Sequence, residues 1–184
     1  GVDLSYDMIK IAKENYPQLK IHQGNVRDVR LNEKFDVVIS LFHVLSYQNS
    51  NAELDQFFQT ISEHLNVNGI AIFDYWYGPA VLELKPESRI KKIIAENAEV
   101  IRFAESKLNV EKNIVTINYD LLVLNSTQVL LRDKETHSMR YFFTPEMDYF
   151  ISANRLKNIC SSTWNTINQE PDQTSWPVYN IVQL

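Results

Sequence analysis

The chain has 184 residues, of which 45% are hydrophobic and 22% charged, and its net charge is −5. This composition is typical of one globular domain, and the negative charge argues against nucleic acid as the main partner. No apolar run reaches the roughly 18 residues of a membrane span. The single cysteine, Cys160, excludes an internal disulfide and a cysteine-clustered metal site. With neither a disulfide nor a signal peptide visible, we expect a cytoplasmic protein.

Glycine is scarce, with only four residues in the chain. No glycine-rich phosphate or dinucleotide loop can be formed from them. The first residues, from Gly1 to Ser5, are typical of the end of a strand that runs straight into a helix. We therefore expect that an N-terminal segment is missing from this sequence.

Strand and helix patterns alternate in the first half of the chain. Apolar spacing predicts a helix within 6–15, and the β-branched run 35–40 is typical of a parallel strand buried on both faces. Residues 51–65 carry apolar side chains on one face of a second helix, and 70–74 form another buried strand. Strands that alternate with helices predict an open, doubly wound α/β sheet.

The pattern changes in the second half. A polar segment predicts a helix around 86–96, and alternating stretches then predict an antiparallel sheet. These stretches are 99–105, 113–124, 127–133 and 137–143. A further helix is expected from Thr144 to about residue 159, followed by closing strands at 162–169 and 178–184.

Five short motifs occur in the order and at the spacings of one family of enzymes. They lie at residues 1–8, 23–28, 35–38, 65–70 and 74–79. On these motifs the chain resembles the class I S-adenosylmethionine (SAM)-dependent methyltransferases, from the end of their second strand to the C-terminus. The glycine-rich loop that holds the methionine end of SAM in the family has no counterpart here. The pattern is most similar to small-molecule N-methyltransferases that act on nucleotide-linked amino sugars.

The resemblance implies a Rossmann-like α/β fold. Its sheet would be mostly parallel, with one antiparallel strand near the C-terminus at about 177–184. An antiparallel β insert would cover the active site at the carboxyl edge of the main sheet. The expected parts are a SAM-binding core at 1–98, the insert at 99–143, and a C-terminal helix with closing strands at 144–184.

The resemblance also implies which residues bind SAM. Asp3 matches the acid that accepts hydrogen bonds from the ribose hydroxyls, although a helix N-cap is an alternative role. Asn25 matches the acid that binds the adenine amino group, and its amide oxygen can accept the same bond, unless it is only a turn residue. Core packing is the alternative for Leu4 and Met8. The other expected contacts are Leu4, Gly24, Val26 and Leu41.

Two histidines are the candidate catalytic bases. His43 follows the strand 35–40, at the sheet edge where ligands bind, and His137 lies in the insert. A packed or surface histidine is the alternative for both. Arg140 can pair with a substrate phosphate or form a surface salt bridge, and Asp74 is either an active-site acid or a strand-end cap. The expected substrate contacts are Tyr47, Trp76, Tyr77 and Arg140.

These residues favour transfer of a methyl group from SAM to an amine of a nucleotide-linked sugar or a similar small metabolite. An O-methyltransferase stays open as an alternative, and so does a truncated or degenerate protein without activity. A dinucleotide-dependent oxidoreductase is a weaker rival, because no set of acid and base residues for hydride transfer is visible. We expect no nucleic acid, no membrane and no metal as partners, and a homodimer is left open.

Overall fold

The structure is a computed structural model, and it describes residues 1–95, 98–125, 128–164, 166 and 168–184. Its helices are α1 (Tyr6–Asn15), α2 (Asn51–His64), α3 (Gly78–Leu84) and α4 (Thr144–Ala153), with a 3-10 turn η1 (Leu45–Tyr47). Its strands are β1 (Val2–Asp3), β2 (His22–Gln23), β3 (Phe35–Ser40), β4 (Leu65–Tyr77), β5 (Arg89–Ala95), β6 (Ala98–Asn109), β7 (Ile114–Asn125), β8 (Gln128–Phe142), β9 (Lys157–Thr163) and β10 (Pro177–Gln183).

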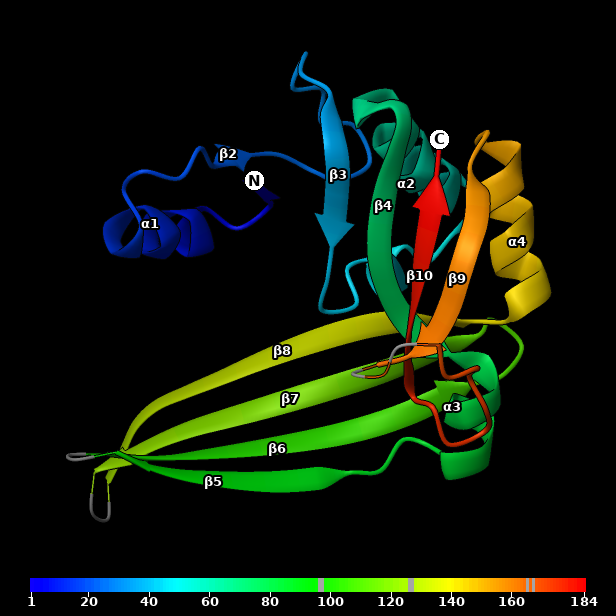
Figure 1. The fold of residues 1–184 in the computed structure, drawn as a ribbon. Helices are drawn as coiled ribbons and strands as arrows, with labels where there is room; N and C mark the ends of the chain where they lie inside the picture. The colour runs from blue at the N-terminus through cyan, green and yellow to red at the C-terminus, as the bar shows by residue number, and fades with distance from the viewer. Residues whose placement is uncertain (96–97, 126–127, 165, 167) are drawn as a thin grey trace.

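The main sheet has the strand order β3, β4, β10, β9 (Figure 1). β3 runs parallel to β4, whereas β10 runs antiparallel to both β4 and β9. The prediction of an antiparallel strand at about 177–184 is confirmed by β10. The other closing strand, β9, lies at Lys157–Thr163 rather than at 162–169, and it ends where the amide of Thr163 donates to the carbonyl of Gln169 and the chain turns. The helix that begins at Thr144 ends at Ala153, so its predicted extension to about residue 159 is wrong.

Helices α2 and α4 pack together on one face of this sheet; in Figure 1, α2 lies behind β4 and β10, and α4 lies beside β9. Helix α2 begins with a reciprocal capping box between Ser50 and Glu53, and its apolar side chains are buried. On the other face, Val37 and Ile39 of β3 are exposed. The expectation that this strand is buried on both faces is therefore wrong for the described residues, because α2 and α4 pack on one side only.

Strands β3 and β4 pair around a local irregularity. Phe35 is level with Leu65, but Val37 is level with Ile70. A side chain at Gly69 would bring its Cβ within 3.1 Å of the Phe35 carbonyl oxygen. Glycine is therefore needed at this close approach between the two backbones.

Strands β5 to β8 form a long antiparallel sheet, which we call the arm (Figure 1). The arm joins the main sheet where β8 pairs in parallel with the end of β4, at Trp76 and Tyr77. With the arm included, the sheet is mixed rather than mostly parallel. The helix predicted around 86–96 is wrong as far as it is described, because Arg89–Ala95 is the edge strand β5 paired with β6.

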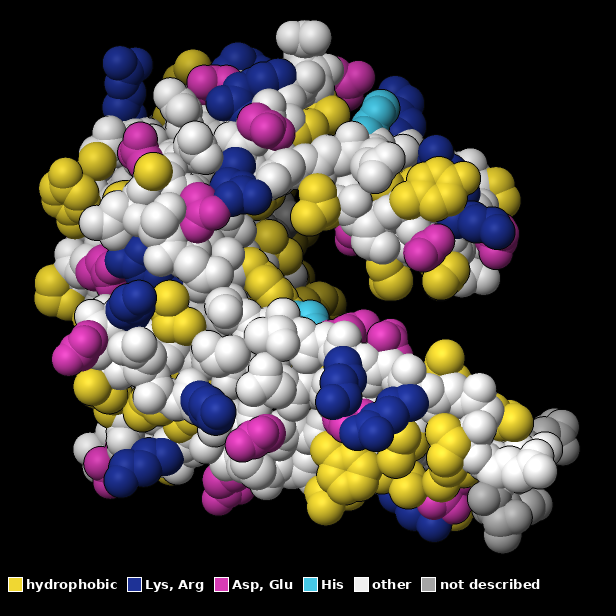
Figure 2. Space-filling model, turned by 180° about the vertical axis from the view of Figure 1, so that it is seen from behind, with side chains coloured by type: hydrophobic (Ala, Val, Ile, Leu, Met, Phe, Trp, Pro, Cys, Tyr) yellow, Lys and Arg dark blue, Asp and Glu magenta, His cyan; other side chains and the backbone are white. Residues whose placement is uncertain are grey.

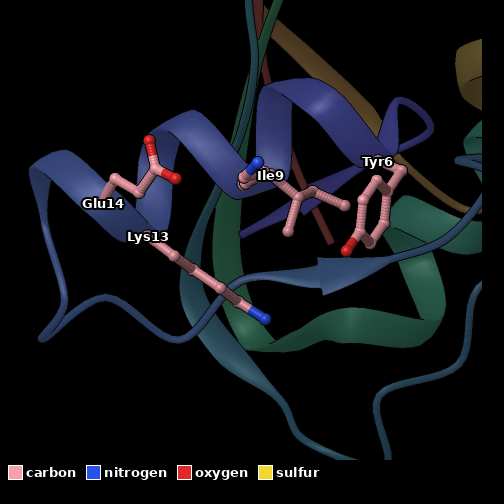
Figure 3. Close-up of a pocket in the computed structure, with 5 residues that line it drawn as sticks. Tyr6, Ile9, Lys13 and Glu14 are labelled. Carbon is pink, nitrogen blue, oxygen red and sulfur yellow. The ribbon is translucent and has the colours of Figure 1, made fainter.

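The N-terminal residues form a separate small unit. β1 and β2 pair in parallel, and α1 packs against them through its buried residue Ile9. Figure 3 shows the face of α1 that carries Tyr6, Ile9, Lys13 and Glu14 around a shallow pocket. This unit and the arm lie on the two sides of a deep cleft (Figure 2). No helix among the described residues is long and apolar enough to cross a membrane.

Candidate active site

The candidate site lies where the cleft meets the carboxyl ends of β3 and β4. The chain leaves β3 at Ser40 and β4 at Tyr77, and the arm begins to pair with β4 at that same end. In α/β sheets of this kind, ligands bind outside the carboxyl ends of the strands. The segment after β3 contributes His43 and Tyr47, and the end of β4 contributes Asp74 and Trp76.

His43 and Asp74 form a close pair at the centre of this edge. The Nδ1 atom of His43 lies 2.8 Å from Asp74 Oδ2, and the backbone amide of His43 donates to Asp74 Oδ1 at 2.9 Å. The His43 ring is not aligned for a hydrogen bond from Nδ1. The Asp74 side chain is only 1% exposed, so this buried carboxylate faces the His43 ring directly.

The backbone that presents His43 is strained. Phe42 has a φ of 63° and His43 a φ of 64°, and this left-handed conformation is unfavourable for residues with a Cβ atom. The hydrogen bond from the His43 amide to Asp74 holds the turn in place. The His43 ring also packs edge-on against Trp76, with ring centroids 6.1 Å apart. Two contacts to β4 therefore fix the position of this imidazole.

A second set of polar contacts connects the turn η1 to strand β8 of the arm. The hydroxyl of Tyr47 lies 2.8 Å from Nδ1 of His137, and Nε2 of His137 lies 3.2 Å from a carboxylate oxygen of Glu135. Because a carboxylate only accepts, a neutral His137 ring that bonds Glu135 donates from Nε2, and its Nδ1 then accepts from the Tyr47 hydroxyl. Burial, with smaller effects of Tyr119 and Glu135, raises the pKa of Tyr47 above its usual value, which keeps this hydroxyl protonated. Both nitrogens of His137 are thus engaged.

The aromatic run after β4 divides between the core and the cleft. Tyr75 is buried in the core below α2 and α4. Trp76 is partly exposed and packs edge-on against Trp176, with centroids 5.4 Å apart. Tyr77 is partly buried and packs on the main core. Of the three, Trp76 is the side chain placed beside His43.

Arg140 is engaged within the protein. Its guanidinium pairs with Glu146 of α4 and donates to Asn51 Oδ1 at 2.7 Å. The residue is buried, and its group lies 5.4 Å from the Phe142 ring. Through these contacts, Arg140 joins strand β8 of the arm to α2 and α4.

The residues expected to bind ribose and adenine are accessible. Ser5, rather than Asp3, caps α1, because its hydroxyl accepts from the amide of Met8. Asp3 is exposed at the end of β1, with one carboxylate oxygen accepting from the amide of Ser5 at 2.8 Å. Leu4 and Met8 are 66% and 56% exposed, so core packing does not explain these apolar side chains.

The loop after β2 is more constrained. The amide of Gly24 donates to the carbonyl of Asp3, which joins the two loops. The amide oxygen of Asn25 accepts from both the backbone and the Nε atom of Arg27, as a turn residue does. Val26 and Leu41 are partly buried, and Val26 packs on the main core. The amide nitrogen of Asn25 has no hydrogen bond among the described residues.

Sequence reasoning missed several members of this site. The sequence does not decide between the two roles of Asp74, because its pairing with His43, 31 residues away, depends on the register of β3 and β4. Glu135 and Tyr119 were not singled out, although alternation along the strand already placed Glu135 on the same face as His137. No group of three or more His, Cys, Asp or Glu able to hold a metal occurs in the described part of the chain.

Comparison with known proteins relates the N-terminal part of the chain to one family model. Residues 1–69 match the family model described as "Methyltransferase domain". A dTDP-3-amino-3,4,6-trideoxy-alpha-D-glucopyranose N,N-dimethyltransferase of Streptomyces venezuelae is 35% identical over 79 residues, which cover 43% of this chain and 33% of the relative. A dTDP-3-amino-3,6-dideoxy-alpha-D-glucopyranose N,N-dimethyltransferase of Streptomyces fradiae is 25% identical over 154 residues, which cover 83% and 59%. The matches thus span about one third to three fifths of the curated relatives.

Solved structures agree on the fold. A SAM-dependent methyltransferase from Clostridium acetobutylicum superposes with a TM-score of 0.85 at 18% identity, covering 100% of this chain and 73% of the other. The sugar N-methyltransferase KedS8 from Streptoalloteichus gives a TM-score of 0.81 at 20% identity, covering 98% and 69%. The chain therefore has the fold of the SAM-dependent methyltransferases, and the resemblance stated from the sequence is confirmed. Within that class, the curated relatives described here are N,N-dimethyltransferases of dTDP-linked amino sugars.

Proposed function

We propose that this protein is a SAM-dependent methyltransferase that acts on an amine of a small molecule, of the nucleotide-linked amino sugar class. The observation that carries the proposal is the pair His43–Asp74 at the carboxyl ends of β3 and β4, where the fold family binds its ligands. The family match over residues 1–69 and the names of the curated relatives support both the cofactor and the acceptor class.

The residues of the first loops fit SAM. The second carboxylate oxygen of Asp3 has no hydrogen bond among the described residues, so it is free to accept from ribose hydroxyls. The exposed side chains of Leu4 and Met8 offer an apolar wall for adenine. Asn25 and Val26 would lie on the opposite side, with Gly24 giving the backbone room, and Leu41 would meet the methionine part. When bound, SAM supplies an activated methyl group on a sulfonium.

The residues of the chain would align the acceptor amine with the methyl group and remove one proton from its ammonium form. An amine attacks only as its neutral form, and the new N–C bond forms as the S–C bond breaks, with the electron pair leaving on sulfur. His43 is placed to take the proton from the acceptor ammonium, because its Nε2 atom has no hydrogen bond among the described residues. Asp74 orients this ring and stabilises its protonated form.

The remaining predicted residues have more specific roles in this proposal. Trp76 and Tyr77 would line the acceptor pocket below the arm, which would cover the site. The Tyr47 hydroxyl would face the acceptor while His137 holds it in position. His137 acts as a base only if it releases Tyr47 or Glu135, and Arg140 reaches a substrate anion only if it releases Glu146.

Two experiments test the proposal. Calorimetric titration with SAM separates an active enzyme from a degenerate protein, because only the enzyme is expected to bind. Incubation with SAM and a dTDP-linked amino sugar, followed by mass spectrometry, should show the gain of one or two methyl groups. The matched sugar with a hydroxyl in place of the amine should stay unmodified, and methylation of that sugar alone would favour an O-methyltransferase. Sedimentation of the same sample tests whether the protein forms a homodimer.

A further inference from the structure

Two cations face each other on neighbouring strands of the arm. Lys91 of β5 and Arg102 of β6 are direct partners in the strand register, so their side chains lie on the same face of the sheet. Both are exposed. Like charges directly opposite each other destabilise an antiparallel pair unless something neutralises them.

On the other face of the arm, cationic side chains form ion pairs with carboxylates. There Lys92 pairs with Glu99 at 2.7 Å, and Arg132 pairs with Asp120 through two hydrogen bonds. Lys91 and Arg102 have no carboxylate within ion-pair distance among the described residues. Two adjacent cations are thus left without a counter-ion on one face only.

That face leads directly to the candidate site. The Arg102 guanidinium lies over the ring of Tyr119, 5.3 Å from its centroid. The Tyr119 ring in turn lies 5.3 Å from the ring of His137, which binds Tyr47 and Glu135. One row of contacts therefore crosses the arm from the acceptor end at β8 to the cations at β5 and β6.

The charges along this row are separated by sign. Glu135, and Asp133 two residues before it, lie on this same face at β8, while Lys91 and Arg102 lie at β5 and β6. Two strand spacings, about 10 Å, separate β8 from β6. The face therefore suits a ligand with a cationic amine at one end and an anion at the other, and Tyr119 offers an aromatic surface between them.

We propose that Lys91 and Arg102 bind the phosphate groups of the acceptor, a diphosphate in a nucleotide-linked amine. The inference rests on the proposed function, since the amine end is placed at the candidate site. Arg102 can bind phosphate oxygens with two parallel hydrogen bonds, and Lys91 adds a second charge. A diphosphate carries enough negative charge to neutralise both.

The test uses calorimetry with two probes, thymidine diphosphate and inorganic pyrophosphate, on the full chain. Lys91→Ala and Arg102→Ala should each weaken binding of thymidine diphosphate by about tenfold or more. Lys92→Ala is the matched control, because it removes the same charge from the next residue on the opposite face, and it should change the affinity less than twofold. Thermal unfolding of each variant checks that the fold is retained.

The outcomes separate this inference from the proposed function. Equal loss in Lys92→Ala, no loss in Lys91→Ala and Arg102→Ala, or a parent protein that binds neither probe would overturn the assignment. Similar affinity for both probes supports recognition of the diphosphate, and tighter binding of thymidine diphosphate adds recognition of the nucleoside. SAM affinity is measured in the same samples: its absence counts against the proposed function, whereas normal SAM binding without diphosphate binding counts only against this site.

Discussion

The carboxylate of Asp74 and the imidazole of His43 lie 2.8 Å apart, on segments that are 31 residues apart in the chain. Asp74 also accepts the backbone amide of His43, so one buried side chain fixes both the turn and the ring. This double contact makes Asp74 a positioning residue for the base that we propose.

Replacing Asp74 with asparagine tests that role. Asp74→Asn keeps the size of the side chain and removes the charge that would stabilise protonated His43. We expect kcat to fall by about ten- to a hundredfold, while the affinity for SAM changes less than twofold. Steady-state kinetics and calorimetry measure the two quantities. Asp36→Asn is the matched control, since Asp36 is exposed and bonds Asn66 at the other end of β3; equal losses in both variants would refute the assignment.

The turn at Phe42 provides a test on stability. Phe42 is 81% exposed and has a φ of 63°, so its ring contributes little burial while its Cβ strains the backbone. Phe42→Gly should therefore leave stability unchanged or raise it by up to about 1 kcal/mol. Val67→Gly, at an 86% exposed position of β4 outside the left-handed region, should lower stability instead. Urea unfolding compares them, and a marked loss in Phe42→Gly would show that its ring packs in solution.

Tyr47 gives a pH-dependent prediction. Burial raises its pKa above the ordinary value of 10.0, with further contributions from Tyr119 and Glu135. A group whose pKa is higher in the folded than in the unfolded protein adds its full stability at a pH below the pKa of the unfolded state. That contribution is lost as the pH rises through the pKa of the folded state. The parent should therefore be more stable than Tyr47→Phe at neutral pH, and this advantage should shrink above about pH 10. Urea midpoints across pH measure it, with Tyr16→Phe on the exposed end of α1 as control. A constant difference across the range would contradict the assignment.

Local patterns were enough to predict some elements. The sequence of helix α2 has a capping residue at Ser50 and regular apolar spacing, and the structure shows both the capping box and the buried apolar face. The segment 89–95 was assigned to the wrong element because adjacent lysines and isoleucines fit either a helix or a strand, and only pairing with β6 decides between them. Propensity in such a segment is a weak guide beside tertiary contacts.

The candidate site shows a similar division. His43, Tyr47 and Trp76 could be singled out because they follow strands at the end where ligands bind. Their partners could not be predicted. The contact of Tyr47 with His137 links residues 90 positions apart, and it depends on how the arm is attached to β4. The engagement of Arg140 by Glu146 likewise follows from the placement of α4 against the arm.

The central claim is that the loops after β1 and β2 bind SAM, and calorimetry on Asp3 variants tests it most directly. Asp3→Ala should weaken SAM binding by about tenfold or more, because alanine has no carboxylate to accept charge-assisted hydrogen bonds from the ribose hydroxyls. Asn25→Ala should weaken it less, and Asn25→Asp should bind equally well or more tightly. Asp28→Ala, which removes an exposed charge from the second loop, should bind SAM like the parent. If Asp3→Ala also binds SAM like the parent, the cofactor does not lie on these loops and the account is wrong.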